Sequence, residues 1–308
     1  YSSAASDVYK RQTRILVERL KKVIEQVING TQTGFVPGRR IQWNTHLLNL
    51  IEAYLDETDE EGLFVFLDWE KAFDRVSWDY LHEAAKNIGL GKDMCRWLQV
   101  LYDSDRPAVR RANVNGHFSS FFKLGCGTAQ GCPASPVIFL IIAEGLSRLI
   151  GEDPEWEPIV INGVEHRVSQ FADDTVGLIR RMTGLHALQN NVIIFEQATG
   201  GQANKSKYEG IRLGRLRKPE HDRGFEKDIR VELKLTAGRV KLSLDVPSGL
   251  NYPLGRQIKW CEKGGYVTSL GVPHGWDFSV RDFMMGKYLK TKTLMAGWHD
   301  VKRMSIHG

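Results

Sequence analysis

Two adjacent acids, Asp173 and Asp174, lie between apolar runs in the segment VSQFADDTVGLI, and this pair constrains the fold more than any other feature. The β-branched and aromatic residues on both sides predict two strands, so the acids should occupy the turn that joins them. Read alone, such a pair is ordinarily a simple turn, because Asp hydrogen-bonds to its own backbone. The alternative is a pair of metal-binding carboxylates at the tip of a hairpin, which requires a third acid nearby.

Asp68 is the best candidate for that third acid. It ends the apolar run LFVFLD, which predicts a buried strand. If this strand lies beside the hairpin, its carboxylate comes next to the acidic pair. Read alone, Asp68 is better explained as the N-cap of a following helix. Asp74 is a rival for the role, but it lies farther from the end of the strand.

Apolar periodicity predicts the other elements. Apolar residues at helical spacing, or long apolar runs, predict helices within residues 13–28, 47–55, 78–90, 93–103, 135–150 and 280–301. Two Asn-Gly pairs, at 115–116 and 162–163, are typical of type I′ hairpin turns between short strands. A further strand pair is expected within residues 230–246. Helices alternating with hairpins favour an α+β fold with an antiparallel sheet.

Composition narrows the class of protein but not its function. The chain has 308 residues, of which 42% are hydrophobic, and this is enough for a real core. The net charge of +5 favours polyanions only mildly, and the four cysteines show neither zinc-ligand nor disulfide spacing. The longest apolar run, Val137 to Ala143, is far shorter than a membrane span requires. Residues 1–12 have no hydrophobic period, and we expect a non-native or disordered leader there.

Two loops rich in glycine and proline precede predicted helices. The first, QTGFVPGRR, contains Arg39 and Arg40, and the second, GTAQGCPASP, contains Gln130 and Gly131. Such loops are commonly mere connections between elements. Glycine also lets the backbone approach a ligand closely, and the start of a helix favours anionic groups, so the second loop could contact a ligand.

Taken in order, these segments resemble the reverse transcriptases of non-LTR (LINE-type) retrotransposons. FLDWEKAFDRV resembles motif A of that family, GTAQGCPASPVIFL motif B and FADD motif C, while QTGFVPGRR is similar to its fingers segment. ATGGQANKSKYEGIRLG and YVTSLGVPHG resemble motifs D and E. The resemblance covers roughly Gln32 to Gly275. It implies a right-hand polymerase fold of palm and fingers, with an antiparallel palm sheet packed on helices and the thumb largely absent.

The resemblance also implies a reaction: RNA-directed DNA polymerisation by a two-metal mechanism, with two Mg²⁺ ions or with Mn²⁺ in their place. Asp68 and Asp173 would be the main metal ligands, and Asp174 would support them. Lys207 would protonate the leaving pyrophosphate as a general acid, with Lys205 as the competing assignment.

Four further residues are implied as contacts of the incoming nucleotide. Phe73 matches the steric gate that disfavours a ribose 2′-hydroxyl, although a core aromatic is the plain alternative. Gln130 and the adjacent Gly131 would lie beside the nucleotide. Arg39 would pair with the triphosphate through its forked donors, with Arg40 as the competing assignment.

The expected organisation follows from the motif order. It comprises a leader at 1–12, partial fingers at 13–60, a palm with interleaved fingers elements at 61–213, an insertion of unclear role at 214–263, and a primer-grip region with the start of a thumb at 264–308. The expected partners are an RNA template, a DNA primer, deoxynucleotides and the missing endonuclease and thumb regions of a parent polyprotein, without a membrane. We expect an intracellular protein that is nuclear when acting on target DNA. The rival hypothesis is a truncated or inactive remnant that at most binds nucleic acid.

Overall fold

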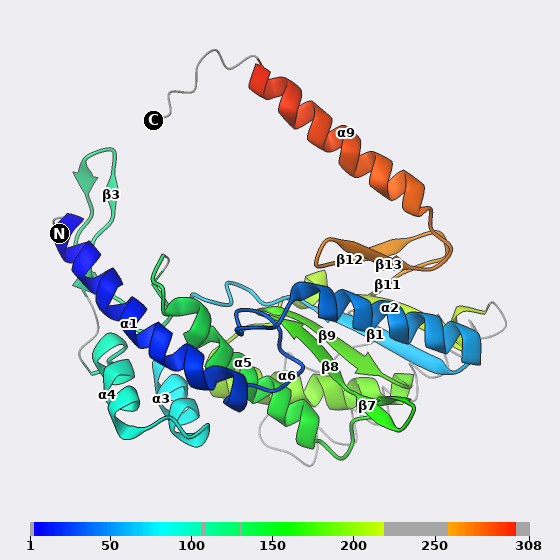
Figure 1. Cartoon of the computed structure of the whole chain (residues 1–308), viewed down its shortest axis with the longest axis horizontal. Coiled ribbons are helices and arrows are strands. Elements are labelled where there is room, and N and C mark those ends of the chain that lie inside the picture. Colours follow the sequence, from blue (N-terminus) through cyan, green and yellow to red (C-terminus); the bar gives the residue numbers. More distant parts are fainter. Residues whose placement is uncertain (1–2, 106–108, 130, 219–257, 300–308) are drawn as a thin grey trace.

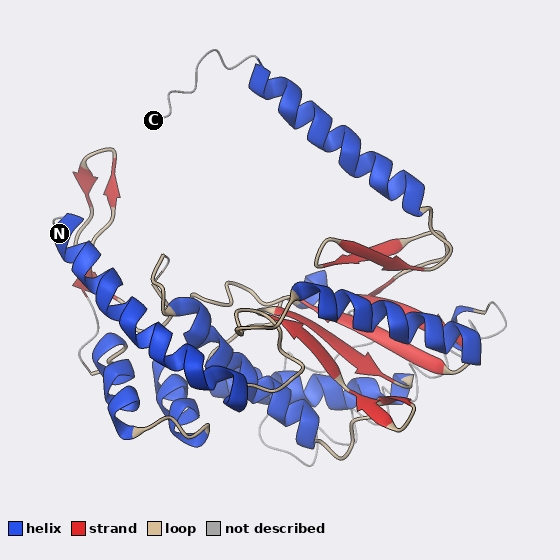
Figure 2. Ribbon diagram, in the orientation of Figure 1, coloured by secondary structure: helices blue, strands red, loops and turns tan. Residues whose placement is uncertain are grey.

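A five-stranded sheet with helices on both faces forms the centre of the molecule (Figures 1 and 2). The computed structural model describes residues 3–105, 109–129, 131–218 and 258–299. The helices are α1 (Ser3–Val27), α2 (Ile41–Thr58), α3 (Trp78–Asn87), α4 (Lys92–Leu101), α5 (Ser135–Glu152), α6 (Leu185–Thr199) and α9 (Val280–His299), with 3-10 turns η1 (Met182–Gly184), η2 (Lys205–Lys207) and η3 (Arg215–Arg217). The sheet contains β1 (Glu61–Leu67), β8 (Val168–Phe171), β9 (Asp174–Ile179), β10 (Glu209–Gly214) and β11 (Lys259–Trp260).

The order of the strands is β11-β10-β1-β9-β8, so β1 lies in the middle. Its neighbours β10 and β9 are both antiparallel to it, and β8 is antiparallel to β9. Leu67, the last residue of β1, is paired with Thr175 near the start of β9. The end of β1 therefore lies beside the β8–β9 turn, as the sequence predicts. The β10–β11 pair is parallel and departs from the purely antiparallel expectation.

Alternation along β1 separates two hydrophobic cores, because successive side chains of a strand point to opposite faces. Leu63, Val65 and Leu67 belong to the larger core, which they share with residues of α1, α3, α5 and α6. Phe64 belongs to a second core with residues of α2, β9 and β10. Each fully buried side chain of this size contributes about 1.5–3 kcal/mol. The short segment β1 therefore stabilises both faces of the sheet at once.

In the described part of the chain, four antiparallel pairs of short strands lie outside the main sheet. They are β2 (Val109–Arg110) with β5 (Phe122–Lys123), β3 (Asn113–Val114) with β4 (His117–Phe118), β6 (Ile159–Ile161) with β7 (Val164–His166), and β12 (Tyr266–Ser269) with β13 (Val272–Gly275). Asn115 and Gly116 have φ of 52° and 87°, and Asn162 and Gly163 have φ of 50° and 79°. Both predicted Asn-Gly turns therefore have the left-handed conformations of a type I′ turn.

The α+β class and the predicted order of helices and hairpins are confirmed. Helix α1 begins at Ser3, inside the segment expected to be a leader, and α9 begins at Val280 as predicted. The strand pair expected at 230–246 lies outside the described residues, as do most of the expected insertion and the end of the chain. In the ranges given above, each helix is too short or too polar to cross a membrane.

Candidate active site

Asp173 lies in the β8–β9 turn, and Asp174 directly follows it as the first residue of β9. Phe171 and Asp174 are paired across the hairpin, so Ala172 and Asp173 form a two-residue turn. Ala172 has φ of 55°, the left-handed conformation that a residue with a Cβ rarely adopts. Asp174 begins β9 and, by alternation, shares the face of Val176, which is also the face of Phe64 and the second core.

Asp68 and Asp174 line one polar cleft. Asp68 directly follows β1, and its carboxylate lies 3.2 Å from the ammonium of Lys207. The cleft is also lined by Glu209 and Lys259, and it is bounded by the turn of the β12–β13 hairpin. The complete lining is Phe66, Leu67, Asp68, Asp174, Thr175, Val176, Lys207, Glu209, Lys259, Thr268, Ser269 and Leu270. Motifs far apart in the sequence thus meet at one end of the sheet.

The three predicted carboxylates influence one another electrostatically. Burial raises the pKa of Asp174, and the negative charges of Asp173 and Asp68 raise that pKa further. A cation placed among these groups would relieve that repulsion, and Lys207 already contributes one positive charge beside Asp68. The donors are hard carboxylate oxygens, which suit a divalent cation such as Mg²⁺ held by one or two carboxylates with water and substrate phosphates. The residues present therefore fit such an ion.

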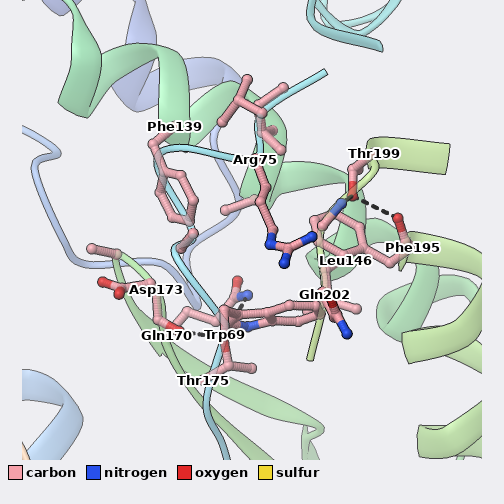
Figure 3. A pocket seen from close by; sticks show the side chains of 16 residues that line it. Trp69, Arg75, Phe139, Leu146, Gln170, Asp173, Thr175, Phe195, Thr199 and Gln202 are labelled. Atoms are coloured by element: carbon pink, nitrogen blue, oxygen red, sulfur yellow. Dashed lines mark hydrogen bonds between the residues drawn. The ribbon is translucent and has the colours of Figure 1, made fainter. Parts of the chain in front are cut away.

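Asp173 lies on the other side of the turn. It is at the edge of a small, mainly apolar cavity between Trp69, Phe139 and Phe195. In Figure 3 its carboxylate points away from the other labelled side chains of that cavity. Within the described ranges, no three His, Cys, Asp or Glu side chains gather closely enough to hold one metal ion. The structure pairs Asp68 with Asp174 in a common cleft, and the ranking of Asp173 above Asp174 stays a prediction.

Hydrogen bonds between a short loop and the residues after β1 hold Lys207 near the end of that strand. Asn204 donates its backbone N–H to the carbonyl of Asp68 at 2.8 Å, and Glu70 donates to the carbonyl of Gln202 at the same distance. These bonds place η2 next to the strand end. Lys207, at the end of η2, forms an ion pair with Asp68, whereas Lys205 forms none with the carboxylates of the described residues. The geometry favours Lys207 of the two predicted lysines.

Phe73 lies between the motif A segment and α5. Its ring stacks on Phe139 with centroids 4.5 Å apart, and its carbonyl accepts a hydrogen bond from the backbone N–H of Thr128 at 2.9 Å. Phe73 is half-buried against the larger core, so the gate and core-aromatic readings are both compatible with its place. Gln130 lies outside the described residues. Gly131 is exposed at φ of 75°, and its role stays a prediction.

Arg39 occupies a structural position. Its guanidinium donates to four backbone carbonyls around the end of α1, including those of Ile28 at 3.0 Å and Gln32 at 2.7 Å. These bonds satisfy carbonyl groups that a helix end leaves without partners. To bind a triphosphate, Arg39 would have to leave them. Arg40 is exposed and is the N-cap residue of α2. Of the two arginines, Arg40 is therefore the more accessible to a triphosphate.

The β12–β13 hairpin, whose turn bounds the cleft, is attached to α2 through a cluster of charged side chains. Arg217 donates to the carboxylates of Glu52 and Asp56 on α2 and to the carbonyl of Gly275 on β13, the last at 3.2 Å. His274 is fully buried, with its ring 3.6 Å from Glu52. Burial alone would raise the pKa of Glu52, but His274 and Arg217 outweigh it and lower that pKa. This cluster connects the β12–β13 hairpin to α2.

Gln32 and Asn44 have no sequence feature that singles them out, yet both are buried polar residues bonded to the β8–β9 hairpin. Neither belongs to an acidic, basic or metal-ligand pattern. The one available signal is the presence of uncharged polar side chains next to glycine in a loop, and this is too common to identify a site. Their positions emerge only from contacts across more than a hundred residues of sequence.

Comparison with known proteins is consistent with this geometry. The family model described as reverse transcriptase (RNA-dependent DNA polymerase) matches residues 2–222. The chain is 29% identical over 217 residues to the transposon TX1 uncharacterized 149 kDa protein of Xenopus laevis, covering 70% of this chain and 16% of that protein. It is 24% identical over 199 residues to the retrovirus-related Pol polyprotein from type-2 retrotransposable element R2DM of Drosophila melanogaster. This match covers 63% of this chain and 18% of that protein.

Two solved structures of telomerase from Candida tropicalis are similar to this chain at lower sequence identity. The apo enzyme truncated from its C-terminal domain has a TM-score of 0.45 at 13% identity, covering 67% of this chain and 40% of that one. The apo enzyme has a TM-score of 0.47 at 12% identity, covering 66% and 36%. The chain matches only a small part of its curated relatives, 16% and 18% of their lengths.

Proposed function

The chain belongs to the reverse transcriptase (RNA-dependent DNA polymerase) family, and we propose that it adds deoxynucleotides to a DNA primer on an RNA template. The observation that carries this proposal is the cleft shared by Asp68 and Asp174, with Lys207 at 3.2 Å from Asp68. In this proposal the sheet is the palm of a right-hand polymerase, the segments before Glu61 are part of the fingers, and α9 begins the thumb.

Asp68 and Asp174, with Asp173 from the adjoining turn, would hold the divalent ions. When bound, Mg²⁺ or Mn²⁺ would increase the nucleophilicity of the primer hydroxyl and neutralise charge on the pyrophosphate that leaves. A cation bound there would favour the ionised form of Asp174, whose pKa is raised by burial and by the negative charges of Asp173 and Asp68.

Lys207 is the group that can deliver a proton to the leaving oxygen. Its ammonium is at the cleft and exposed, so it can exchange its contact with Asp68 for one with a pyrophosphate oxygen. Proton donation to a leaving group is the task of a general acid. The loop bonds to Asp68 and Glu70 hold Lys207 in place for that transfer.

Phe73 and Arg40 are proposed as nucleotide contacts. The ring of Phe73 is held by Phe139 beneath the segment that follows Asp68, where it would crowd a ribose 2′-hydroxyl. Arg40 would offer its forked donors to the triphosphate, while Arg39 keeps the preceding loop attached to α1. Gln130 and Gly131 would also contact the incoming nucleotide.

The relatives matched by the chain are much longer proteins, so partners and location are also proposals. A retrotransposon origin would supply an endonuclease and the remainder of the thumb from the same parent polyprotein. Copying RNA into chromosomal DNA would take place in the nucleus.

Primer extension on an RNA template with Mg²⁺ and deoxynucleotides tests the proposal, both with this chain and with the parent protein that contains it. Asp68→Asn should reduce extension by about 10³-fold, since it removes several kcal/mol of charge stabilisation. Asp93→Asn is the matched control, because Asp93 is 94% exposed in the first turn of α4. Extension that survives Asp68→Asn would contradict the site. Tight binding of a primer–template without extension in the unmodified protein would instead favour the inactive remnant.

A further inference from the structure

We propose that Gln32 is a positioning residue, whose side-chain amide holds the turn carrying Asp173 in the geometry that the catalytic carboxylates require. This inference rests on the proposed function, since it assigns a task within that active site. Gln32 lies in the loop between α1 and α2 and is separated from the turn by 140 residues of sequence.

Gln32 forms a two-point contact with a single residue of the turn. Its Oε1 accepts from the backbone N–H of Ala172 at 2.8 Å, and its Nε2 donates to the carbonyl of Ala172 at 3.1 Å. Gln32 is 1% exposed and Ala172 is 5% exposed, so water cannot replace either bond. The same Oε1 also accepts from the N–H of Gly34 at 2.9 Å. One amide therefore joins the two segments.

Ala172 needs such a partner because of its conformation. Its φ of 55° costs about 1–3 kcal/mol for a residue other than glycine and persists only where the surroundings determine it. Asp173 is the next residue, so a change in the backbone of Ala172 would displace its carboxylate. Gln32 binds both polar groups of Ala172 and thereby opposes rotation of this peptide.

The two segments are also in direct steric contact. A Cβ built on Gly34 would lie 2.3 Å from the backbone nitrogen of Ala172, which is far below any permitted separation. Only glycine allows the loop to approach the turn this closely. The position of the Gln32 amide above Ala172 therefore depends on the absence of a side chain at Gly34.

Neighbouring hydrogen bonds extend the contact along β8. Thr33 donates its N–H to the carbonyl of Gln170 at 2.9 Å, and Gln170 donates its N–H to the carbonyl of Thr31 at 2.9 Å. Asn44 on α2 donates to the same Gln170 carbonyl and to the hydroxyl of Ser169, both at 2.9 Å. The loop thus behaves as a short additional strand at the edge of β8, and Gln32 is its one side chain that bonds to the turn backbone itself.

A substitution that removes only the amide tests this role. Gln32→Met keeps the length of the side chain but leaves the N–H and carbonyl of Ala172 without their bonds. Gln26→Met is the matched control, because Gln26 is an exposed residue of α1. Both variants are compared with the unmodified chain for Mn²⁺ affinity by electron paramagnetic resonance, and for kcat and KM of single-nucleotide addition per active site.

We expect Gln32→Met to weaken Mn²⁺ binding by about 10- to 100-fold, as is usual when a residue that orients metal ligands is lost. The kcat should fall by about 10²-fold, because a displacement of about 1 Å at a reacting group has that effect, while KM for the nucleotide changes little. Gln26→Met should change none of these quantities. Normalising to active sites removes any contribution from misfolded protein.

Two outcomes overturn the proposal. If Gln32→Met lowers thermal stability but keeps Mn²⁺ affinity and kcat per active site, Gln32 is only a structural residue. If KM rises and kcat is unchanged, the loop acts in nucleotide binding and not on the turn. Failure of the proposed function is a separate result: the unmodified protein would then extend no primer, while the Mn²⁺ affinities would still decide whether Gln32 positions the carboxylates.

Discussion

Lys207 and Asp68 form an ion pair in which both side chains remain substantially exposed, at 62% and 38%. An exposed pair of this kind contributes only about 0–1 kcal/mol to stability, because solvent screens it. Its presence at the end of β1 is therefore better explained by chemistry than by folding. The pair also keeps a positive charge beside a carboxylate that is expected to bind a metal ion.

Lys207→Met should lower the rate of nucleotide addition by about 10²-fold, which is the lower end of what a general acid contributes. Lys205→Met is the control, since Lys205 lies in the same turn without the contact to Asp68. Equal losses in the two variants, measured by rapid-quench kinetics, would show that the assignment to Lys207 is wrong.

The buried cation Arg217 helps to hold the β12–β13 hairpin at the active-site cleft. Arg217 is 9% exposed and joins α2, β10 and β13, since it also donates to the carbonyl of Arg212 at 2.8 Å. Removing one partner of such a group leaves a buried donor unsatisfied, which costs about 1–3 kcal/mol. Attachment of this hairpin should therefore depend on the ionisation of Glu52.

The sign of that dependence follows from the lowered pKa of Glu52, whose ordinary value is 4.5. A carboxyl whose pKa is lowered by folding contributes stability that is present above its ordinary pKa and lost as the pH falls through the lower folded value. Between about pH 5 and about pH 3, the melting temperature of the unmodified protein should thus fall more steeply than that of Glu52→Gln. Glu57→Gln, at an exposed position of the same helix, should follow the unmodified protein. Parallel curves for all three proteins in calorimetry would refute the role of Glu52.

The molecule as a whole is organised around β1, which contributes to both cores and delivers Asp68 to the cleft. Folding therefore brings Asp68 and Asp174 into one cleft, with Asp173 in the adjoining turn, although burial and the charges of Asp173 and Asp68 raise the pKa of Asp174. A bound cation would offset that cost, so metal binding and folding should be thermodynamically linked.

Mg²⁺ should consequently stabilise the unmodified chain, by about 1.4 kcal/mol at a concentration ten times its Kd. The double variant Asp68→Asn/Asp174→Asn should melt at the same temperature with and without Mg²⁺, while Asp93→Asn keeps the full response. Melting curves at constant ionic strength separate this effect from general screening. A response to Mg²⁺ that the double variant retains would place the ion elsewhere.

Much of the architecture was predictable because it depends on local patterns. The Asn-Gly turns, the buried strand before Asp68 and the apolar helix α5 all follow from periodicity and turn chemistry. The acids were identified as candidates for the same reason, since each stands at the end of an apolar strand. The parallel pairing of β11 and the start of α1 at Ser3 were not predictable, because short strands and helix ends carry weak local signals.

The sequence by itself determined the α+β class, the family and which acids are candidates for the site, because these depend on short contiguous motifs. Only the tertiary structure decided how these residues are arranged. Asp174 shares a face with Asp68, Arg39 donates hydrogen bonds to carbonyl groups at the end of α1, and Gln32 forms hydrogen bonds with the backbone of Ala172. The physical reason is that strand register and buried hydrogen bonds depend on partners far away in the chain, and a one-residue change of register would move every side chain to the opposite face.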